Sequence, residues 1–412
     1  MKTKKVFPTK WYVRILIYIY FAIFIFFYRI KIKMPSNIKK LKGPYLFLSN
    51  HVGYWDPFIA GLYLPEFTHF VSSDASFRNK FQRFFLNSFG AIPKKKNIRD
   101  TKVIRDIISV IKQGENVGLF PEAVRNWSGS SFPIDNSISK LIKLLKVPVV
   151  VSVMKGMNLF NPRWSTKLRR TKIEIDYTLL LTKEQIVSMS DDEVYEKLMS
   201  VLTHDEVEYQ RTNMNKVHSK YKAENINHTL FLCPECNTID SFRAEGNDFY
   251  CSKCNYDIHI NDYSFFERKS EGKLVFDNIR DWYYWQEKWL LDYVTEKVEN
   301  KFADVIFEDK NSKIFHSDSE LDLSYIGNAD IKLFIDRIEI HFIENTKIVI
   351  MNYADLQTIN PQVNEMLEIF YDNEAYRVIG SRKGVSALKW EVAVNAIWKK
   401  IGMLNKLSPY IG

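Results

Sequence analysis

Short apolar runs alternate with amphipathic segments between residues 45 and 156, and this alternation restricts the possible folds more than any other feature of the chain. Two of the runs, 45–48 and 147–156, are typical of buried strands. Other segments have apolar residues at helical spacing, namely 77–89, 101–114 and 137–146. Strands that alternate with helices predict an α/β domain, a mixed sheet flanked by helices, which we place at residues 35–215.

Residues 1–34 form a basic and apolar segment that we expect to anchor the chain to a membrane. The first 50 residues contain eleven Lys or Arg, and the first carboxylate of the chain is Asp56, although the net charge of the whole chain is only +9. An unbroken apolar run, Ile15–Tyr28, lies between two arginines. As a helix this run would cover about 21 Å, which is less than the roughly 30 Å of a hydrocarbon core.

The residues after this run argue against a cleaved signal peptide. Such a peptide ends in small residues, whereas Arg29, Lys31 and Lys33 follow here. We therefore expect a retained helix, either half-inserted with its arginines at the headgroups or crossing as a tilted span. A helix buried in the protein core is the alternative. The basic flanks favour an anionic bilayer, and we expect the cell membrane.

All four cysteines of the chain fall in two CxxC pairs, Cys233 with Cys236 and Cys251 with Cys254. The spacing C-x2-C-x14-C-x2-C is close to that of a four-thiolate zinc site, and four thiolates close the coordination sphere, so we expect a structural zinc. The alternative is a loop of reduced or disulfide-bonded cysteines. Zinc would hold together residues 225–265, which are too few to fold alone. Thiolate ligands imply a reducing compartment, and hence the cytoplasmic face of the membrane.

The rest of the chain contains two segments with different apolar patterns. Residues 266–299 are expected to form a linker helix in which Trp282, Trp285 and Trp289 share one face. We favour packing between domains for this face over a membrane contact. Residues 300–412 contain short strand-like runs with Asp and Asn between them, followed by one helical stretch, and this pattern predicts a mostly β domain with one terminal helix.

The candidate chemistry begins with the stretch SNHVGYWDPF, in which His51 and Asp56 follow the first predicted strand. A site at this position would lie at the carboxyl edge of the sheet. The two side chains can meet only if the residues around Gly53 form a turn, because a five-residue separation on a helix points them apart. Asp56 is then either the orienting partner of a histidine base or simply the cap of a helix that starts at Pro57.

Two further loops follow predicted strands and add positive charge. The stretch FPEAVRN places Glu122 and Arg125 in one short loop, where an arginine is well suited to bind a phosphate or carboxylate. The stretch GAIPKKKN carries three successive lysines, a pattern that is more often a solvated face. Three such loops at one edge of a sheet would form a pocket with a base and an anion cradle.

The order of these stretches resembles the glycerolipid acyltransferase family, which includes 1-acyl-sn-glycerol-3-phosphate acyltransferases. NHVGYWDP is similar to the H-x4-D block of that family, GAIPKKK to its second block, FPEAVRN to its third, usually FPEGTRS, and VPVVVSVMKG to its fourth. The resemblance covers roughly residues 30–215. Ala123 and Val124 replace the usual Gly and Thr, and Lys96 stands where arginine is common, so the acceptor is less defined than the reaction.

The resemblance implies acyl transfer from acyl-CoA or an acyl carrier protein to a lysophospholipid hydroxyl, giving phosphatidic acid in phospholipid biosynthesis if the acceptor is 1-acyl-sn-glycerol-3-phosphate. His51 would be the general base and Asp56 would orient it. Lys96 and Arg125 would hold the acceptor phosphate, and Glu122 would hydrogen-bond to the glycerol. No catalytic cofactor is expected beyond the acyl donor.

The C-terminal half resembles other modules. The cysteine segment resembles a zinc ribbon, and residues 300–412 resemble a pleckstrin-homology-type domain. The alternative function is a catalytically inactive, membrane-tethered protein that binds lipid or nucleic acid. The intact set of His51, Asp56, Glu122 and Arg125 favours the enzyme, and nucleic acid is not the expected partner.

Overall fold

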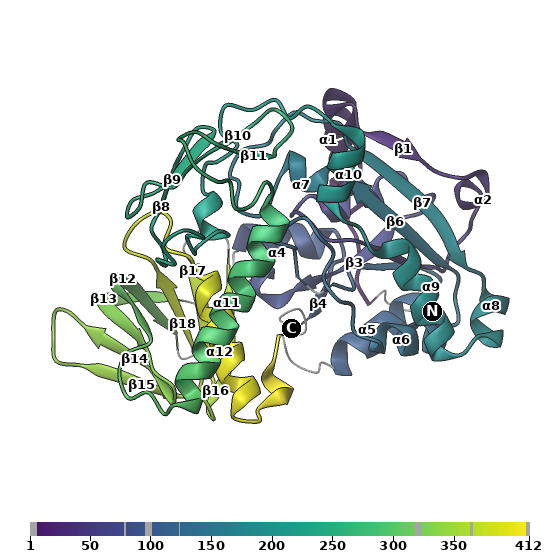
Figure 1. The fold of residues 1–412 in the computed structure, drawn as a ribbon. Helices are drawn as coiled ribbons and strands as arrows, with labels where there is room; N and C mark the ends of the chain where they lie inside the picture. The colour runs from purple at the N-terminus through teal and green to yellow at the C-terminus, as the bar shows by residue number, and fades with distance from the viewer. Residues whose placement is uncertain are drawn as a thin grey trace. The chain divides into compact units, whose positions relative to one another are not determined.

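The computed structural model contains two compact units, and each is considered by itself (Figure 1). Unit 1 comprises Met1–Arg163 and Arg169–Val217, and unit 2 comprises Trp164–Leu168 and His218–Gly412. The structure describes residues 6–77, 80–94, 101–122, 124–317, 323–362 and 366–408.

Unit 1 is built on a seven-stranded mixed sheet with the order β1-β7-β6-β2-β5-β3-β4. β2 pairs in parallel with both β5 and β6, whereas β7 runs antiparallel to β6. The strands are β1 (Lys31–Lys33), β2 (Leu46–Ser49), β3 (Thr68–Ser73), β4 (Ile92–Lys94), β5 (Asn116–Leu119), β6 (Val149–Lys155) and β7 (Glu174–Leu181). The predicted mixed α/β sheet is therefore confirmed.

The side chains of β2 show how the two faces of this sheet are covered. Phe47 belongs to one core cluster, together with residues of α1 and α3, and Leu46 and Leu48 belong to a second cluster with residues of α5, α6 and α9. All three side chains are fully buried. The helices are α1 (Trp11–Tyr28), α2 (Ser36–Lys39), α3 (Asp56–Gly61), α4 (Lys80–Ser88), α5 (Thr101–Lys112), α6 (Ser137–Leu145), α7 (Met157–Phe160), α8 (Lys183–Ser188), α9 (Asp191–Leu202) and α10 (Glu206–Asn213).

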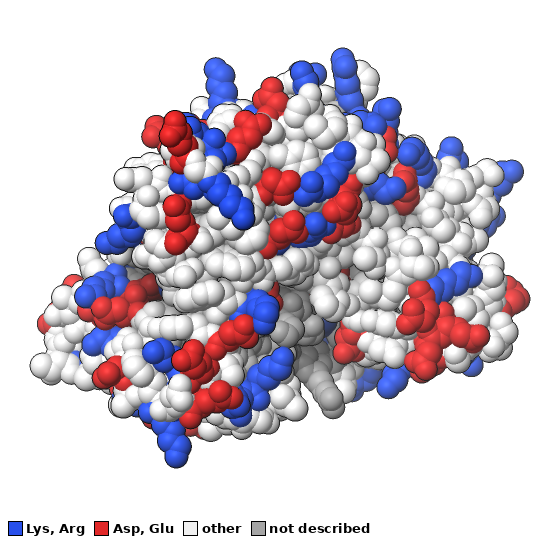
Figure 2. Space-filling view, in the orientation of Figure 1, with Lys and Arg blue, Asp and Glu red and all other residues white. Residues whose placement is uncertain are grey.

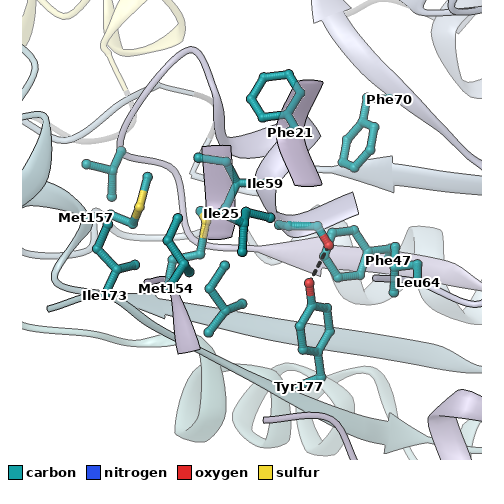
Figure 3. Close-up of a cluster of buried hydrophobic side chains, with 14 of the residues drawn as sticks. Phe21, Ile25, Phe47, Ile59, Leu64, Phe70, Met154, Met157, Ile173 and Tyr177 are labelled. Carbon is teal, nitrogen blue, oxygen red and sulfur yellow. Dashed lines mark hydrogen bonds between the residues drawn. The ribbon is translucent and has the colours of Figure 1, made fainter. Parts of the chain in front are cut away.

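The N-terminal helix α1 is part of the core of unit 1 along one face. Ile17, Phe21 and Ile25 recur at intervals of four residues and are buried, and the Phe21 ring stacks on Phe58 with centroids 5.0 Å apart. Figure 3 shows Phe21 and Ile25 among side chains from the sheet and from α3, near the hydrogen bond from the Tyr177 hydroxyl to the Ala60 carbonyl. One face of the helix therefore belongs to the core of the folded domain.

The opposite face of α1 is apolar and exposed. It carries Trp11, Tyr12, Ile15, Leu16, Ile19, Tyr20, Ile23, Phe26 and Phe27. By length and composition α1 could cross a membrane, and only 22% of that stretch is buried. In the part of the chain that the structure describes, no other helix meets this criterion.

Unit 2 begins with a small four-stranded sheet in the order β11-β10-β9-β8, which contains the cysteine segment. Its strands are β8 (Phe242–Glu245), β9 (Asp248–Cys251), β10 (Asp257–Ile260) and β11 (Phe266–Arg268). Residues 266–299, expected as a linker helix, thus begin with a strand. The helix α11 (Ile279–Glu299) starts only after Asn278, whose side-chain oxygen accepts the amide of Asp281 at 3.0 Å.

The tryptophans of α11 pack against this small sheet. Trp282 is fully buried among Phe242, Phe249 and Tyr256, and its indole N–H donates to the Leu232 carbonyl at 3.0 Å. Trp285 packs against the same cluster and is partly buried. Trp282 and Trp285 therefore serve packing within unit 2, which agrees with the favoured interpretation for these two tryptophans.

The rest of unit 2 is a seven-stranded antiparallel sheet in the order β15-β14-β13-β12-β18-β17-β16. Its strands are β12 (Phe307–Ser317), β13 (Ser324–Leu333), β14 (Arg337–Phe342), β15 (Ile348–Asn352), β16 (Leu356–Pro361), β17 (Met366–Tyr371) and β18 (Glu374–Ile379). A single α-helix, α12 (Leu388–Lys400), follows the strands in the described part of this segment. This arrangement confirms the mostly β C-terminal domain with one terminal helix.

A buried ionic cluster joins the cysteine segment to the β domain. Lys389 of α12 is 1% exposed at its side chain and forms ion pairs with Asp240 and Asp309, the latter at 2.6 Å. Asp240 lies between the two cysteine pairs and also accepts the backbone amide of Ser386 at 3.1 Å. Trp390 donates its indole N–H to Asp309 at 2.6 Å. The cysteine segment and the β domain therefore belong to the same unit and are joined by a buried ionic cluster.

Candidate active site

The candidate site starts where β2 ends. Asn50 fixes the end of β2 to β6 through two hydrogen bonds to Met154. Its side-chain nitrogen donates to the Met154 carbonyl at 3.0 Å, and its side-chain oxygen accepts the Met154 amide at 2.8 Å. Both residues are buried. The next residue, His51, therefore leaves the sheet from a fixed point at its carboxyl edge.

His51 and Asp56 meet across a tight turn. One carboxylate oxygen of Asp56, Oδ2, lies 2.9 Å from His51 Nδ1 and also accepts the amides of Val52 at 2.6 Å and Gly53 at 2.8 Å. Asp56 is fully buried. The carboxylate accepts, so Nδ1 carries the proton and Nε2 is left as the basic nitrogen of the ring.

This geometry decides between the two interpretations of Asp56. The helix α3 begins at Asp56, and the position before it, Trp55, makes no side-chain capping bond. The Asp56 carboxylate instead binds backbone amides of the preceding turn and the imidazole, so the capping interpretation is wrong. Gly53 is not required by sterics, because a Cβ there would meet Asp56 Oδ1 at 3.4 Å, an ordinary contact.

The imidazole of His51 is enclosed on most sides. It stacks on the Phe120 ring with centroids 4.4 Å apart, and the side chain remains 21% exposed. Enclosure lowers the pKa of His51, and the positive charges of Arg125 and Arg163 lower it further, whereas Asp56 opposes the shift. The ring is therefore neutral at physiological pH, the state that a general base requires.

The loop that carries FPEAVRN holds the backbone of His51 from both sides. Glu122 Oε1 accepts the His51 amide at 3.1 Å, and the Asn126 amide and side-chain nitrogen lie 3.2 and 3.3 Å from the His51 carbonyl as donors. Glu122 Oε2 accepts the amide of Phe132 at 3.2 Å. Both Glu122 oxygens are thus occupied by backbone donors, and its contact with glycerol stays a prediction.

The Glu122 carboxyl has an unusual pKa because it is buried. The residue is 1% exposed, and burial raises the pKa of its carboxyl to about 8, although the amides of Phe132 and His51 act against the shift. A perturbed carboxyl next to a candidate base is typical of functional sites.

Arg125 brings the loop close to the turn after His51. Its guanidinium carbon lies 3.9 Å from the centroid of the Tyr54 ring, and the residue is partly exposed. The predicted phosphate ligand Lys96 lies outside the described residues, as does Ala123. The structure thus brings together His51, Asp56, Glu122 and Arg125.

Sequence reasoning missed two residues of this site. Asn126 is the last residue of the FPEAVRN stretch, and its place directly after Arg125 is the only sequence signal for it. Arg163 follows β6 and α7, is 7% exposed, and no motif pointed to it. Its Nη1 donates to the Arg125 carbonyl at 2.7 Å.

The four cysteines converge in unit 2. Their Sγ atoms all lie within 4.8 Å of one another, with Cys233 3.6 Å from Cys254 and Cys236 3.6 Å from Cys251. Tetrahedral ligands with bonds of about 2.3 Å would be about 3.8 Å apart. An Asn with positive φ follows each pair, Asn237 at 52° and Asn255 at 61°, and these residues close the two tight turns. The cluster can hold a metal ion.

Comparison with known proteins agrees with this site. Residues 29–155 match the family model described as Acyltransferase. The match includes His51, Asp56, Glu122 and Arg125, so this part of unit 1 is an acyltransferase domain. The match supports the resemblance to glycerolipid acyltransferases for this part of the chain.

Individual relatives are more distant. The 1-acyl-sn-glycerol-3-phosphate acyltransferase of Bacillus subtilis (strain 168) is 24% identical over 170 residues, which are 39% of this chain and 83% of that protein. The acyltransferase PlsC from Thermotoga maritima is 13% identical with a TM-score of 0.39, over 45% of this chain and 75% of that one. The Vps36 N-terminal PH domain is 18% identical with a TM-score of 0.20, over 25% of this chain and 84% of that one. At these TM-scores the two structures define neither fold nor function for this chain.

Proposed function

We propose that this protein transfers a fatty acyl group from an acyl thioester to the free hydroxyl of 1-acyl-sn-glycerol-3-phosphate, forming phosphatidic acid in phospholipid biosynthesis. The observation that carries the proposal is the contact of His51 Nδ1 with the buried Asp56 carboxylate, within a stretch that matches the acyltransferase family. The name of the Bacillus relative supports the choice of acceptor. The thioester donor is acyl-CoA or an acyl carrier protein.

The proposed step uses His51 as general base. Nε2 takes the proton of the acceptor hydroxyl as its oxygen bonds to the thioester carbonyl carbon. The carbon–sulfur bond then breaks, and the leaving thiolate receives the proton from the imidazolium. Asp56 stabilises the imidazolium and keeps the ring in the correct tautomer. The step needs no nucleophilic serine or cysteine.

The acceptor phosphate would bind at Arg125. Arg125 is partly exposed, and its guanidinium lies beside the ring of Tyr54. Tyr54 is two residues before Asp56, which would orient His51. A guanidinium forms two parallel hydrogen bonds with a phosphate, which would fix the distance from phosphate to hydroxyl. Lys96 remains the proposed second ligand.

We propose that α1 lies half-inserted in the cytoplasmic leaflet of the cell membrane. One face of the helix packs into unit 1 through Phe21, whereas residues such as Phe26, 85% exposed, form an apolar outer face. Helix α4 adds Phe81 and Phe84, and the Lys10 amide donates to the Ser88 carbonyl at 2.9 Å, which joins the ends of α1 and α4. Half-insertion fits this arrangement better than a span, because a spanning helix would leave the core of unit 1.

For the cysteine cluster we propose a structural zinc. The sulfur spacing fits four thiolates around one ion, and all four positions are then filled by protein. Cys233, Cys236, Cys251 and Cys254 would hold it. The pleckstrin-homology-like domain would hold the enzyme on lipid or on a partner.

The charge of the cysteine segment argues against nucleic acid as the partner. Residues 225–265 contain six acidic and two basic residues. Figure 2 shows acidic and basic side chains interspersed over β8–β11 on the face in view. A nucleic-acid site requires a field of positive charge, because phosphate contacts dominate affinity.

The proposal is tested with purified protein in detergent. Labelled acyl-CoA or acyl carrier protein is supplied with a panel of lysophospholipids, and the labelled product is identified by chromatography. We expect phosphatidic acid as the main product. Acylation of a different lysolipid would show that 1-acyl-sn-glycerol-3-phosphate is not the acceptor. Binding of lipid without any acyl transfer would favour the alternative function, an inactive binding protein.

A further inference from the structure

Arg163 is a buried cation near the candidate base that no family block includes. It follows α7 in the stretch NPRW, and the residue is 7% exposed. Its guanidinium carbon lies 3.6 Å from the centroid of the Trp127 ring, which is itself buried. An arginine in this setting has a fixed position, because the stacked ring and the surrounding protein restrict its rotamers.

The position of Arg163 connects it to the C-terminal end of the FPEAVRN loop. Its Nη1 donates to the Arg125 carbonyl at 2.7 Å, and Trp127 lies two residues further on. Between them, Asn126 holds the His51 carbonyl. The backbone of the loop is therefore fixed at the residue whose side chain would meet the acceptor.

Arg163 also contributes to the field at His51. The charged groups that act on the imidazole are Asp56, Arg125 and Arg163, and the titratable carboxyl of Glu122 contacts the His51 backbone. The two arginines lower the pKa of His51 in addition to burial, whereas Asp56 raises it. Removal of one positive charge would raise the pKa of His51.

We propose that Arg163 is a positioning residue for acyl transfer, which fixes the Arg125 backbone for acceptor binding and places a buried positive charge near His51. This role rests on the proposed function, because it assigns Arg125 to the acceptor phosphate. Arg163 does not contact the acceptor in this account. It acts through Arg125 and through its charge.

The test compares Arg163→Met and Arg163→Lys with Arg170→Met, an exposed arginine in the same segment. We expect Arg163→Met to raise KM for lysophosphatidate about tenfold, the size of one hydrogen bond to a charged group, and to move the acid limb of kcat/KM to higher pH. Arg163→Lys should restore the acid limb but not KM, because it keeps the charge and loses the fork geometry. Arg170→Met should match the wild type.

A second measurement separates this inference from the proposed function. The imidazole signal of His51 can be titrated by NMR without substrate, and Arg163→Met should raise its midpoint even if lysophosphatidate proves to be the wrong acceptor. Circular dichroism confirms that each variant is folded. The inference is overturned if Arg163→Met equals Arg170→Met in both KM and titration, or if it lowers activity with an unshifted His51 titration.

Discussion

The two chemical sites of this protein are held in different ways. The backbone of His51 is fixed by hydrogen bonds to Glu122 and Asn126, which are far away in sequence, and its ring is held by Asp56, five residues further on. The four cysteines come from two local turns of one short segment, which are joined by the pairing of Phe242 with Cys251 and by two hydrogen bonds from Ser252 to the Ser241 carbonyl. The first site is organised by bonds between distant segments, whereas the second forms within one short segment, and its sulfur atoms are spaced to hold a metal ion.

This difference explains what each site can contribute. A base held by buried groups is ready before substrate binds, which is what catalysis requires. A cluster of four thiolates has no open position for a substrate once a metal is bound, so it can stabilise unit 2 but not take part in the reaction. The predictions below test whether the two sites respond separately.

Metal removal should produce the largest effect, and only in unit 2. We expect a strong chelator, or Cys254→Ser, to abolish the cooperative unfolding of the cysteine segment, because structural zinc contributes on the order of 10 kcal/mol in small zinc domains. Calorimetry and limited proteolysis measure the loss. The exposed, non-ligand neighbour Lys253→Ala serves as control. Unchanged unfolding after verified metal removal would contradict a structural role.

Asp56→Asn should reduce kcat by roughly 10²–10⁴-fold with a small change in KM. An amide can donate to Nδ1, which would place the proton on Nε2 and remove the base. The measurement is steady-state acyl transfer, and the exposed Asp192→Asn is a matched control. Wild-type kcat in Asp56→Asn would mean that the carboxylate does not orient the base.

Lys389→Met should destabilise unit 2 by about 3–5 kcal/mol, since it leaves Asp240 and Asp309 buried without their cation. The effect should appear in thermal unfolding of both the cysteine segment and the β domain, because the cluster joins them. The exposed Lys383→Met is the control. A loss confined to the β domain would show that the two segments unfold separately.

The smallest expected effect is the change in the pH dependence of stability when Glu122 is replaced. Its pKa is raised to about 8 in the folded protein, so the folded state binds the proton more tightly than the unfolded state. The contribution of Glu122 to the free energy of unfolding is therefore fully present below pH 4.5 and is lost as the pH rises through 8. Glu122→Gln should flatten that decline in denaturant titrations from pH 5 to pH 9. An equal slope in both proteins would contradict a buried, neutral carboxyl.

The sequence predicted the elements more readily than their contacts. The strands 45–48 and 147–156 and the helix 137–146 lie within a residue or two of β2, β6 and α6, because each depends on a local pattern of apolar residues. The cysteine cluster was also predictable, since its turns are local. The strand β11 was missed because three residues give too short a pattern to detect.

The site was predictable only in part. The meeting of His51 and Asp56 was one of two open interpretations, and the bonds from Asp56 to Val52 and Gly53 that decide between them involve backbone amides, which carry no side-chain signal. The roles of Asn126 and Arg163 depend on contacts between segments that are distant in sequence. Such contacts exist only once the sheet is formed.

The acyl transfer activity of His51→Ala tests the central claim most directly. Wild type, His51→Ala and His218→Ala, an exposed histidine, would be purified alike and given labelled acyl donor with lysophosphatidate. We predict that His51→Ala loses at least about a hundredfold in rate, while its circular dichroism and liposome binding match those of the wild type and His218→Ala keeps full activity. Transfer by a folded His51→Ala at the wild-type rate would contradict the assignment of His51 as the base.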